Sequence, residues 1–272
     1  MRRRLVVALA AVLLAVSATA AERPRLAAHR GGAGLWPENS LTAFRGAIAL
    51  GVDALEFDVH LTADGEPVVI HDATLDRTTT GRGPVRSLTL ERLQAVRLLD
   101  RAGAPSAETV PTLAQVLELA RPTSVAVLPE IKLDLTRAPY PDFEQRVVAL
   151  LRAHGLLSRA SVQSFDDGVL KRVHALAPAV RTMLLVNRVR MTTYASSPAD
   201  VVRWAVDVGA ADLGLDFRLI DARLLAAARA AGVRVAAWTV NADDDLRRMA
   251  ALGVDLVMSD RPDRARQLLV QP

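Results

Sequence analysis

The chain has 272 residues, 51% of them hydrophobic, and a formal net charge of +4. This length fits one α/β barrel or two small domains, and it allows a large buried core. Because the sequence holds no cysteine, disulfides, thiolate zinc sites and iron–sulfur clusters are excluded. Any metal must therefore be bound by oxygen or nitrogen ligands.

The first twenty residues have the pattern of a secretory signal peptide. Three arginines precede a short apolar run, and Ala18-Thr19-Ala20 matches an A-x-A cleavage site. We therefore expect residues 1–20 to be removed and residues 21–272 to be exported to the periplasm or the extracellular space. The alternative is an uncleaved membrane anchor, for which the apolar run is short. Removal takes away three of the four net positive charges, so the mature chain is not expected to bind nucleic acid. Because the apolar run is removed as well, stable insertion in a membrane is not expected either.

From residue 26 onward, short apolar strands alternate with amphipathic helices. Residues 26–32 are predicted to form a buried strand that runs into a glycine turn, with His29 and Arg30 at its carboxyl end. Ser40 is a suitable N-cap for the helix that follows, and Gly51 is expected to end that helix. This strand and helix begin a series of βα units.

The alternation continues to the end of the chain. Residues 55–72 are predicted to form a hairpin around an Asp64-Gly65 turn, with the second strand ending at His71. Further strands, each with a helix after it, are expected at 124–132, 160–165, 182–186, 213–217, 233–240 and 256–259.

Eight buried strands, each followed by a helix, predict an α/β fold of the (β/α)8 TIM barrel type. Two stretches depart from the pattern. Residues 73–110 are predicted to be a small insertion on the catalytic face, after the second-strand hairpin, and residues 187–197 a long loop.

Acidic residues gather at the predicted carboxyl ends of the strands, where the catalytic groups of such barrels lie. Glu56 and Asp58 are two residues apart in a strand, so their side chains share one face. Two buried carboxylates repel each other unless a cation or a proton lies between them. Glu130 and Lys132 have the same spacing on the next barrel strand. Three carboxylates without cysteine favour a hard divalent cation, Mg²⁺ or Ca²⁺.

Basic residues accompany these acids. His29 and Arg30 follow the first strand, and His71 follows the hairpin. Near a divalent cation, an arginine and a lysine suit a phosphoryl group, because they hold its charge while histidines transfer protons. The residues alone therefore indicate a metal-assisted reaction at a phosphoryl group.

The motifs of the chain resemble those of the glycerophosphodiester phosphodiesterase family, in the family's order and over nearly all of the mature chain. They are HRGGAGLWPENSLTAF, ALEFDVHLTADGEPVVIHDATLDRTTTGRG, VPTL, PEIK, SVQSFD, AWTVN and GVDLVMSDRP. The departures are small: Ser40 and Ser259 stand where Thr is commoner. The resemblance implies a barrel of this kind and a Mg²⁺- or Ca²⁺-dependent cleavage of glycerophosphodiesters to sn-glycerol 3-phosphate and an alcohol.

The resemblance also implies roles for the residues that match its motifs. These are His29 and His71 as the acid/base pair; Glu56, Asp58 and Glu130 as ligands of one divalent cation; and Arg30, Lys132, Asn39 and Trp238 as substrate-binding residues. The basic pair would contact the phosphate, and the tryptophan would line the glycerol pocket. Two points stay open: which histidine is the acid, and whether water or the glycerol 2-hydroxyl attacks the phosphorus.

Structural roles are the alternatives for several of these residues. Glu130 and Lys132 could form a salt bridge at a strand end, and Trp238 could pack inside the barrel. His60 is assigned to the structure, although it would share the face of Glu56 and Asp58, so a supporting role stays open.

Other functions share parts of the pattern. A glycosidase also uses paired carboxylates on such a barrel, but it needs neither the basic residues nor two histidines. A binding protein for polyol phosphates is expected to lack one of the histidines. A sphingomyelinase D-like or phosphoinositide-cleaving phospholipase would share the barrel and differ in its loops. Intact lipids need a hydrophobic docking surface, whereas residues 73–110 carry several arginines and no aromatic residue, which favours a small, soluble diester.

Overall fold

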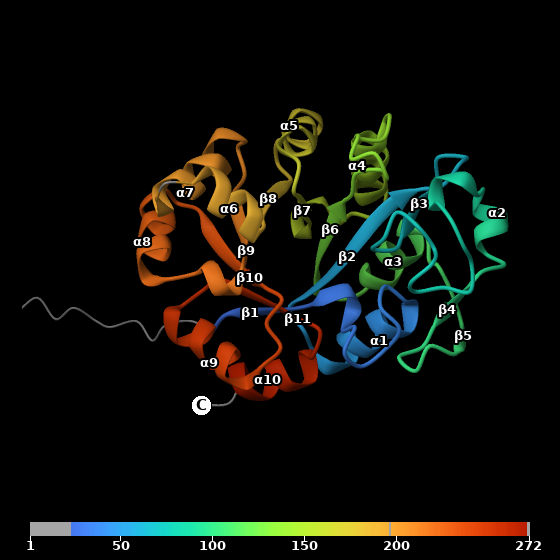
Figure 1. The fold of residues 1–272 in the computed structure, drawn as a ribbon, viewed down its shortest axis with the longest axis horizontal. Coiled ribbons are helices and arrows are strands. Elements are labelled where there is room, and N and C mark those ends of the chain that lie inside the picture. The colour runs from blue at the N-terminus through green and yellow to red at the C-terminus, as the bar shows by residue number, and fades with distance from the viewer. Residues whose placement is uncertain (1–22, 196, 271–272) are drawn as a thin grey trace, which may run out of the picture.

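The computed structural model describes residues 23–195 and 197–270. The predicted signal peptide, residues 1–20, lies outside this part of the chain. Within it, eight parallel strands form a barrel, and each strand is followed by a helix (Figure 1). The predicted (β/α)8 TIM barrel is therefore confirmed.

The barrel strands differ little from the predicted ranges. They are β1 (Arg25–Ala28), β2 (Ala54–Leu61), β6 (Ala126–Ile131), β7 (Ser161–Ser164), β8 (Arg181–Val186), β9 (Asp212–Asp216), β10 (Arg234–Trp238) and β11 (Leu256–Ser259). The helices that follow them are α1 (Leu41–Leu50), α3 (Leu113–Ala120), α4 (Phe143–Ala153), α5 (Asp167–Leu176), α7 (Pro198–Asp207), α8 (Ala222–Ala230), α9 (Asp243–Leu252) and α10 (Pro262–Val270).

The barrel closes because β1 pairs with both the second and the last barrel strand. Ala28 lies opposite Leu55 of β2 and opposite Ser259 of β11, all in parallel register. The carboxyl ends of the eight strands therefore meet at one end of the barrel. The segments that follow β1 and β11, which are far apart in sequence, become neighbours there.

The turn after β1 depends on glycine. Gly31 has φ +77°, and a Cβ at this position would lie 2.8 Å from the Cβ of Ala43 on α1. Only glycine adopts this conformation at so close an approach without strain. Ser40 then caps α1 by accepting a hydrogen bond from the Ala43 backbone N–H, and Gly51 ends the helix in a left-handed conformation, as predicted.

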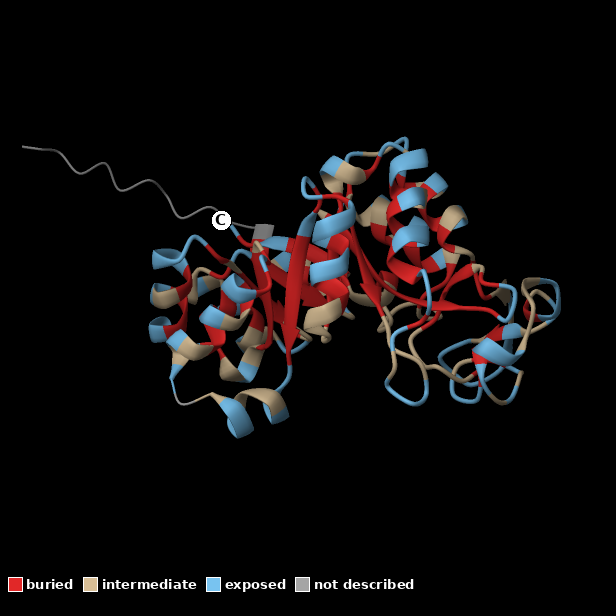
Figure 2. Cartoon of the chain, turned by 90° about the horizontal axis from the view of Figure 1, so that it is seen from above, coloured by how far each residue is buried: buried red, intermediate tan, exposed pale blue. Residues whose placement is uncertain are grey.

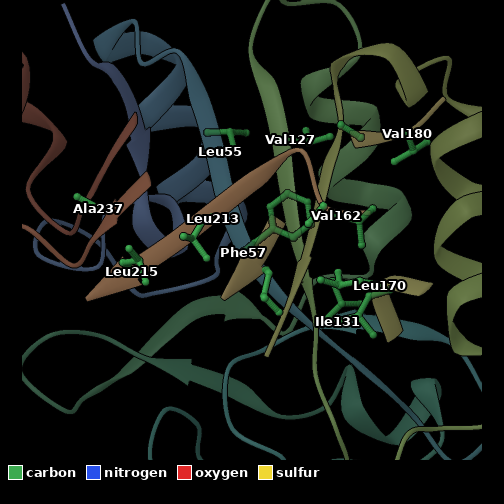
Figure 3. Close-up of a cluster of buried hydrophobic side chains, with 14 of the residues drawn as sticks. Leu55, Phe57, Val127, Ile131, Val162, Leu170, Val180, Leu213, Leu215 and Ala237 are labelled. Atoms are coloured by element: carbon green, nitrogen blue, oxygen red, sulfur yellow. The ribbon is translucent and has the colours of Figure 1, made fainter. Parts of the chain in front are cut away.

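Side chains of the strands alternate between two apolar layers. Leu55 and Phe57 of β2 point outward, into the large core between the barrel and its helices (Figure 3). Ala54, on the opposite face, belongs to a smaller cluster inside the barrel. Figure 2 shows the result as buried strands surrounded by helices whose outer faces are exposed. Burial of a side chain such as that of Phe57 contributes about 1.5–3 kcal/mol to folding.

The predicted insertion after the hairpin is present and has its own small core. It contains α2 (Leu90–Leu93) and an antiparallel pair, β4 (Arg97–Leu99) and β5 (Pro105–Thr109). Leu75, Leu93 and Leu98 pack there against Val68 and Ile70 of the hairpin, so the insertion is fixed to the barrel beyond β2. Figure 1 places it outside the ring of helices.

Two local predictions are wrong. The second strand of the hairpin, β3, spans only Pro67–Val69, so His71 lies in the segment beyond it. The predicted loop at 187–197 contains a helix, α6 (Arg188–Tyr194), because the Asn187 side chain accepts a hydrogen bond from the Arg190 backbone N–H and caps its first turn. None of the helices in the described ranges is long and apolar enough to cross a membrane.

Candidate active site

Three buried carboxylates lie close together on the neighbouring strands β2 and β6. Glu56 and Asp58 both point into the barrel, because they occupy the strand face opposite Leu55 and Phe57. Glu130 of β6 is the register partner of Asp58. One carboxylate oxygen from each of the three acids lies within 4.8 Å of the others, as the spacing in the sequence predicted.

The crowding of these acids is unfavourable without a cation between them. Burial and the neighbouring charge of Asp58 raise the pKa of Glu56 to about 7. Burial also raises the pKa of Glu130. Oxygen donors at this spacing, in a chain without cysteine, fit a hard divalent cation such as Mg²⁺ or Ca²⁺.

The three acids are held in place by polar neighbours. Lys132, one residue beyond β6, places Nζ 3.0 Å from Asp58 Oδ1 and 2.7 Å from Glu130 Oε1. Asn39 donates from Nδ2 to Asp58 Oδ2 at 3.0 Å. Gln163 of β7 donates from Nε2 to Glu56 Oε1 at 2.8 Å. Burial alone would raise the pKa of Asp58, but the charge of Lys132 and other nearby cations keep it well below its usual value.

His29 contacts an acid that lies near the other end of the chain. Its Nδ1 lies 2.6 Å from Asp260 Oδ1, and its Nε2 lies 3.9 Å from Glu56 Oε2. Asp260 is itself fixed by Asn241, which donates from Nδ2 at 2.8 Å. Burial tends to lower the pKa of His29, but the charges of Glu56 and Asp260 outweigh burial and raise it.

His71 has a similar arrangement with its sequence neighbour. Its Nδ1 lies 2.6 Å from Asp72 Oδ1. Burial lowers the pKa of His71. Both histidines thus use Nδ1 to contact a carboxylate, which leaves Nε2 of each ring available to a ligand.

His60 supports His71 through the backbone. Burial lowers the pKa of His60 to about 4, so the ring is neutral at pH 7. Its Nε2 lies 3.1 Å from the carbonyl oxygen of His71, and its Nδ1 lies 2.8 Å from the hydroxyl of Tyr140. The neutral ring therefore donates to the carbonyl and accepts from Tyr140. His60 therefore contacts the His71 segment through its backbone, and a supporting role stays a prediction.

Arg30 faces the acids from the turn after β1. Its backbone N–H donates to Glu56 Oε2 at 2.8 Å, and its Nη1 donates to Glu38 Oε1 at 3.1 Å. Its Nε is 3.6 Å from Asp58 Oδ2 and has no hydrogen-bond partner among the described residues. A buried donor without a partner is costly, and a ligand oxygen would satisfy it.

The predicted site residues meet at one cavity of about 110 Å³. Eight of the nine line it, and the ninth, Asn39, contacts Asp58 directly. The apolar side of the cavity is formed by Trp238 and Phe165, whose rings meet edge to face with centroids 5.7 Å apart. In the described part of the chain, Trp238 Nε1 and Gln163 Oε1 are buried without a hydrogen-bond partner.

A larger cavity, of about 330 Å³, opens at the opposite end of the barrel. Asp212 there binds the guanidinium groups of Arg181 and Arg234. We assign this end to barrel stability, because the catalytic residues of such barrels lie at the carboxyl ends of the strands.

Residues 29–264 match the model of the glycerophosphoryl diester phosphodiesterase family. The chain belongs to this family. It is 34% identical to the glycerophosphodiester phosphodiesterase of Caldanaerobacter subterraneus subsp. tengcongensis, over 87% of this chain and 93% of that protein. It is 32% identical to the glycerophosphodiester phosphodiesterase of Bacillus subtilis, over 87% of this chain and 83% of that protein. The chain is therefore a phosphoric diester hydrolase.

Solved structures of the glycerophosphodiester phosphodiesterases share the fold. The Agrobacterium tumefaciens enzyme is 27% identical, with a TM-score of 0.73, over 90% of this chain and 99% of that one. A phosphodiesterase of Oleispira antarctica, solved in complex with the product sn-glycerol-3-phosphate, is 26% identical, with a TM-score of 0.78, over 92% of this chain and 98% of that one.

Sequence reasoning missed the residues that position the site of this phosphodiesterase. Asp260 lies in the SDRP motif at the end of the last strand, and Asp72 directly follows His71. Both are acids beside the end of a strand, and this position in the sequence could have indicated that they belong to the site. Only barrel closure shows that Asp260 reaches the histidine that follows the first strand.

Proposed function

We propose that the chain hydrolyses glycerophosphodiesters to sn-glycerol 3-phosphate and an alcohol, with one divalent cation, Mg²⁺ or Ca²⁺, held by Glu56, Asp58 and Glu130. The observation that carries the proposal is that this carboxylate cluster and both histidines border one cavity. Membership of the family and the product complex of the Oleispira antarctica relative support the substrate class.

The basic residues would bind the phosphoryl group. When bound, the cation polarises a phosphoryl oxygen as a Lewis acid. Arg30 offers the unpartnered Nε, and Lys132 places its ammonium group beside two of the three acids. These two side chains hold the negative charge of the phosphate next to the carboxylate cluster.

The two histidines would transfer the protons of the reaction. Hydrolysis removes one proton from the attacking oxygen and delivers one to the oxygen of the leaving alcohol. His29 and His71 border the same cavity and each contacts a carboxylate through Nδ1, which fixes the ring orientation and leaves Nε2 to exchange the proton.

The two halves of the diester would meet different surroundings. The cavity wall of Trp238 and Phe165 suits glycerol, because the two rings offer an apolar surface to its carbon chain. A separate open groove shares His71 and Lys132 with the cavity and continues over Leu133 and Leu135. Leu135 is 56% exposed there. The alcohol half would extend into this groove and be recognised loosely.

An assay of glycerophosphocholine tests the proposal. We expect release of sn-glycerol 3-phosphate and choline, and a loss of several orders of magnitude in kcat on His29→Ala and on His71→Ala, with the folded structure intact by circular dichroism. Near-normal turnover in either variant would remove that histidine from the mechanism. Release of phosphocholine would overturn the assigned product.

We further propose that the phosphodiesterase is exported to the periplasm or the extracellular space. The support is the charged, apolar and small-residue pattern of positions 1–20. N-terminal sequencing of the protein from its native host should start at or close to Ala21. A start at Met1 would contradict export by cleavage.

A further inference from the structure

Arg77, a half-exposed residue of the insertion, binds two carboxylates at once. Its Nε and Nη2 donate to Asp72 at 2.7 Å and 3.1 Å. Its Nη1 and Nη2 donate to Glu38 at 2.9 Å and 2.8 Å. The planar guanidinium group therefore makes a bidentate contact with each acid.

Each of these carboxylates also holds a residue of the candidate active site. Asp72 contacts Nδ1 of His71 at 2.6 Å, and Glu38 accepts a hydrogen bond from Nη1 of Arg30 at 3.1 Å. A continuous series of contacts thus runs from His71 through Asp72, Arg77 and Glu38 to Arg30. It joins the segment after the hairpin to the turn after β1, which are separate parts of the barrel rim.

Arg77 places a positive charge between the two carboxylates of this series, Glu38 and Asp72. Burial would raise the pKa of Glu38 and of Asp72, but hydrogen bonds from Arg77 and from their other partners outweigh it. The pKa of Asp72 falls to about 2. Both carboxylates are therefore ionised at neutral pH and would repel each other without the guanidinium group between them.

A lysine cannot reproduce this contact. An ammonium group is a point charge with three donors, whereas the guanidinium group offers five donors in a rigid, planar fork that matches two carboxylates. The geometry therefore depends on arginine and not only on a positive charge.

We propose that Arg77 is a positioning residue for the phosphodiester reaction: it locks Asp72 and Glu38 together and so sets the orientation of His71 and Arg30. The proposal rests on the proposed function, because it assigns Arg77 to the same site. It also gives the insertion a role, since this part of the chain would complete the catalytic geometry of the barrel.

Substitution of Arg77 tests the proposal against a matched control. Arg77→Lys and Arg77→Ala are each expected to lower kcat/KM for glycerophosphocholine by about 10- to 100-fold, the usual effect of removing a partner that orients a site residue. Both kcat and KM should change, because one end of the series holds a proton-transfer residue and the other a phosphate-binding one. Arg92→Ala, an exposed arginine on α2 of the same insertion, should stay within twofold of the wild type.

Two further readouts separate positioning from a loss of folding. Guanidinium at low millimolar concentration should restore part of the activity lost in Arg77→Ala and should leave the activity of Arg92→Ala unchanged. In an Asp72→Asn background, Arg77→Ala should cost less than in the wild type, because the two residues act in one series.

Wild-type turnover in both Arg77 variants would overturn the proposal. So would an activity loss in Arg77→Ala that is matched by the fraction unfolded and is not rescued by guanidinium. Failure of the proposed function would look different: the wild type itself would release no sn-glycerol 3-phosphate, and the inference would fall with it.

Discussion

Nδ1 of His29 lies 2.6 Å from Oδ1 of Asp260, although 231 residues separate the two in the chain. They meet because β1 and β11 are neighbours in the closed barrel, with Ala28 opposite Ser259. The contact orients the imidazole so that Nε2 faces Glu56 and the cavity.

Asp260→Asn should reduce activity while the fold is kept. The asparagine retains the size of the side chain but loses the charge that favours the observed ring orientation and the protonated form of His29. We expect a fall in kcat of roughly 10- to 100-fold. Steady-state kinetics on glycerophosphocholine measure it, and Asp244→Asn, whose side chain is fully exposed, is the control. Unchanged kcat in Asp260→Asn would show that the contact does not serve catalysis.

Chelation should abolish activity, and Mg²⁺ or Ca²⁺ should restore it. The physical reason is that the three buried acids repel one another unless a cation lies between them. Glu56→Gln should remove a ligand without removing a core contact. Full activity in EDTA would contradict the metal assignment.

The same substitution gives a readout that is independent of activity. A bound cation stabilises the folded state, so Mg²⁺ or Ca²⁺ should raise the melting temperature of the wild type. The rise should be much smaller in Glu56→Gln. In EDTA, Glu56→Gln should melt no lower than the wild type, because the pKa of Glu56 near 7 marks its charged form as unfavourable in the fold. A lower melting temperature of the variant in EDTA would indicate a structural role for Glu56.

Stability should fall in acid partly because of Asp212, at the end of the barrel opposite the active site. Burial raises the pKa of this carboxyl, but hydrogen bonds from Arg234 and Arg181 outweigh burial and lower it. The unfolded chain then takes up a proton near pH 4, at the ordinary pKa of an aspartate, while the folded chain resists. The contribution is complete above about pH 4 and is lost as the pH falls through the lowered folded value.

Asp212→Asn should therefore cost about 1.5–3 kcal/mol of unfolding free energy at pH 7, since it weakens two charge-assisted contacts in a buried place. The difference from the wild type should shrink below about pH 4. Urea denaturation at pH 7, 5 and 3.5 measures it. A difference that stays constant across this range would show that the charge of Asp212 is not what stabilises the barrel.

Deacylated glycerophosphodiesters should be cleaved in preference to their diacyl parents. In the described residues, the exposed large hydrophobic side chains are few: Leu135, Leu176, Val206, and Val189 and Tyr194 on α6. An intact lipid needs a larger docking surface. We expect a higher kcat/KM for glycerophosphocholine than for phosphatidylcholine. The double variant Val189→Ser/Tyr194→Ser should leave the value for the small substrate unchanged. A higher value for the intact lipid that falls in this double variant would favour the phospholipase alternative.

Features that depend on periodic patterns or on neighbouring residues could be predicted from the sequence alone. Apolar runs alternating with helical patterns predicted the barrel, and the period of two along β2 predicted that Glu56 and Asp58 share a face. The cap at Ser40 and the stop at Gly51 could also be predicted, because each depends on residues within one helical turn. These features follow from backbone geometry that neighbouring residues determine.

Contacts between distant segments were decided by the tertiary structure. Asp260 reaches His29 only because the barrel closes, and Arg77 joins Glu38 to Asp72 only because the insertion packs on the rim beside β2. No periodic pattern in the sequence predicts which of these distant residues contact each other, since their positions depend on how all eight strands are arranged. The sequence by itself was enough to predict which side chains meet at the candidate site, and the tertiary structure decided which partners hold them, because orientation in a buried site is set by packing and hydrogen bonds across the whole barrel.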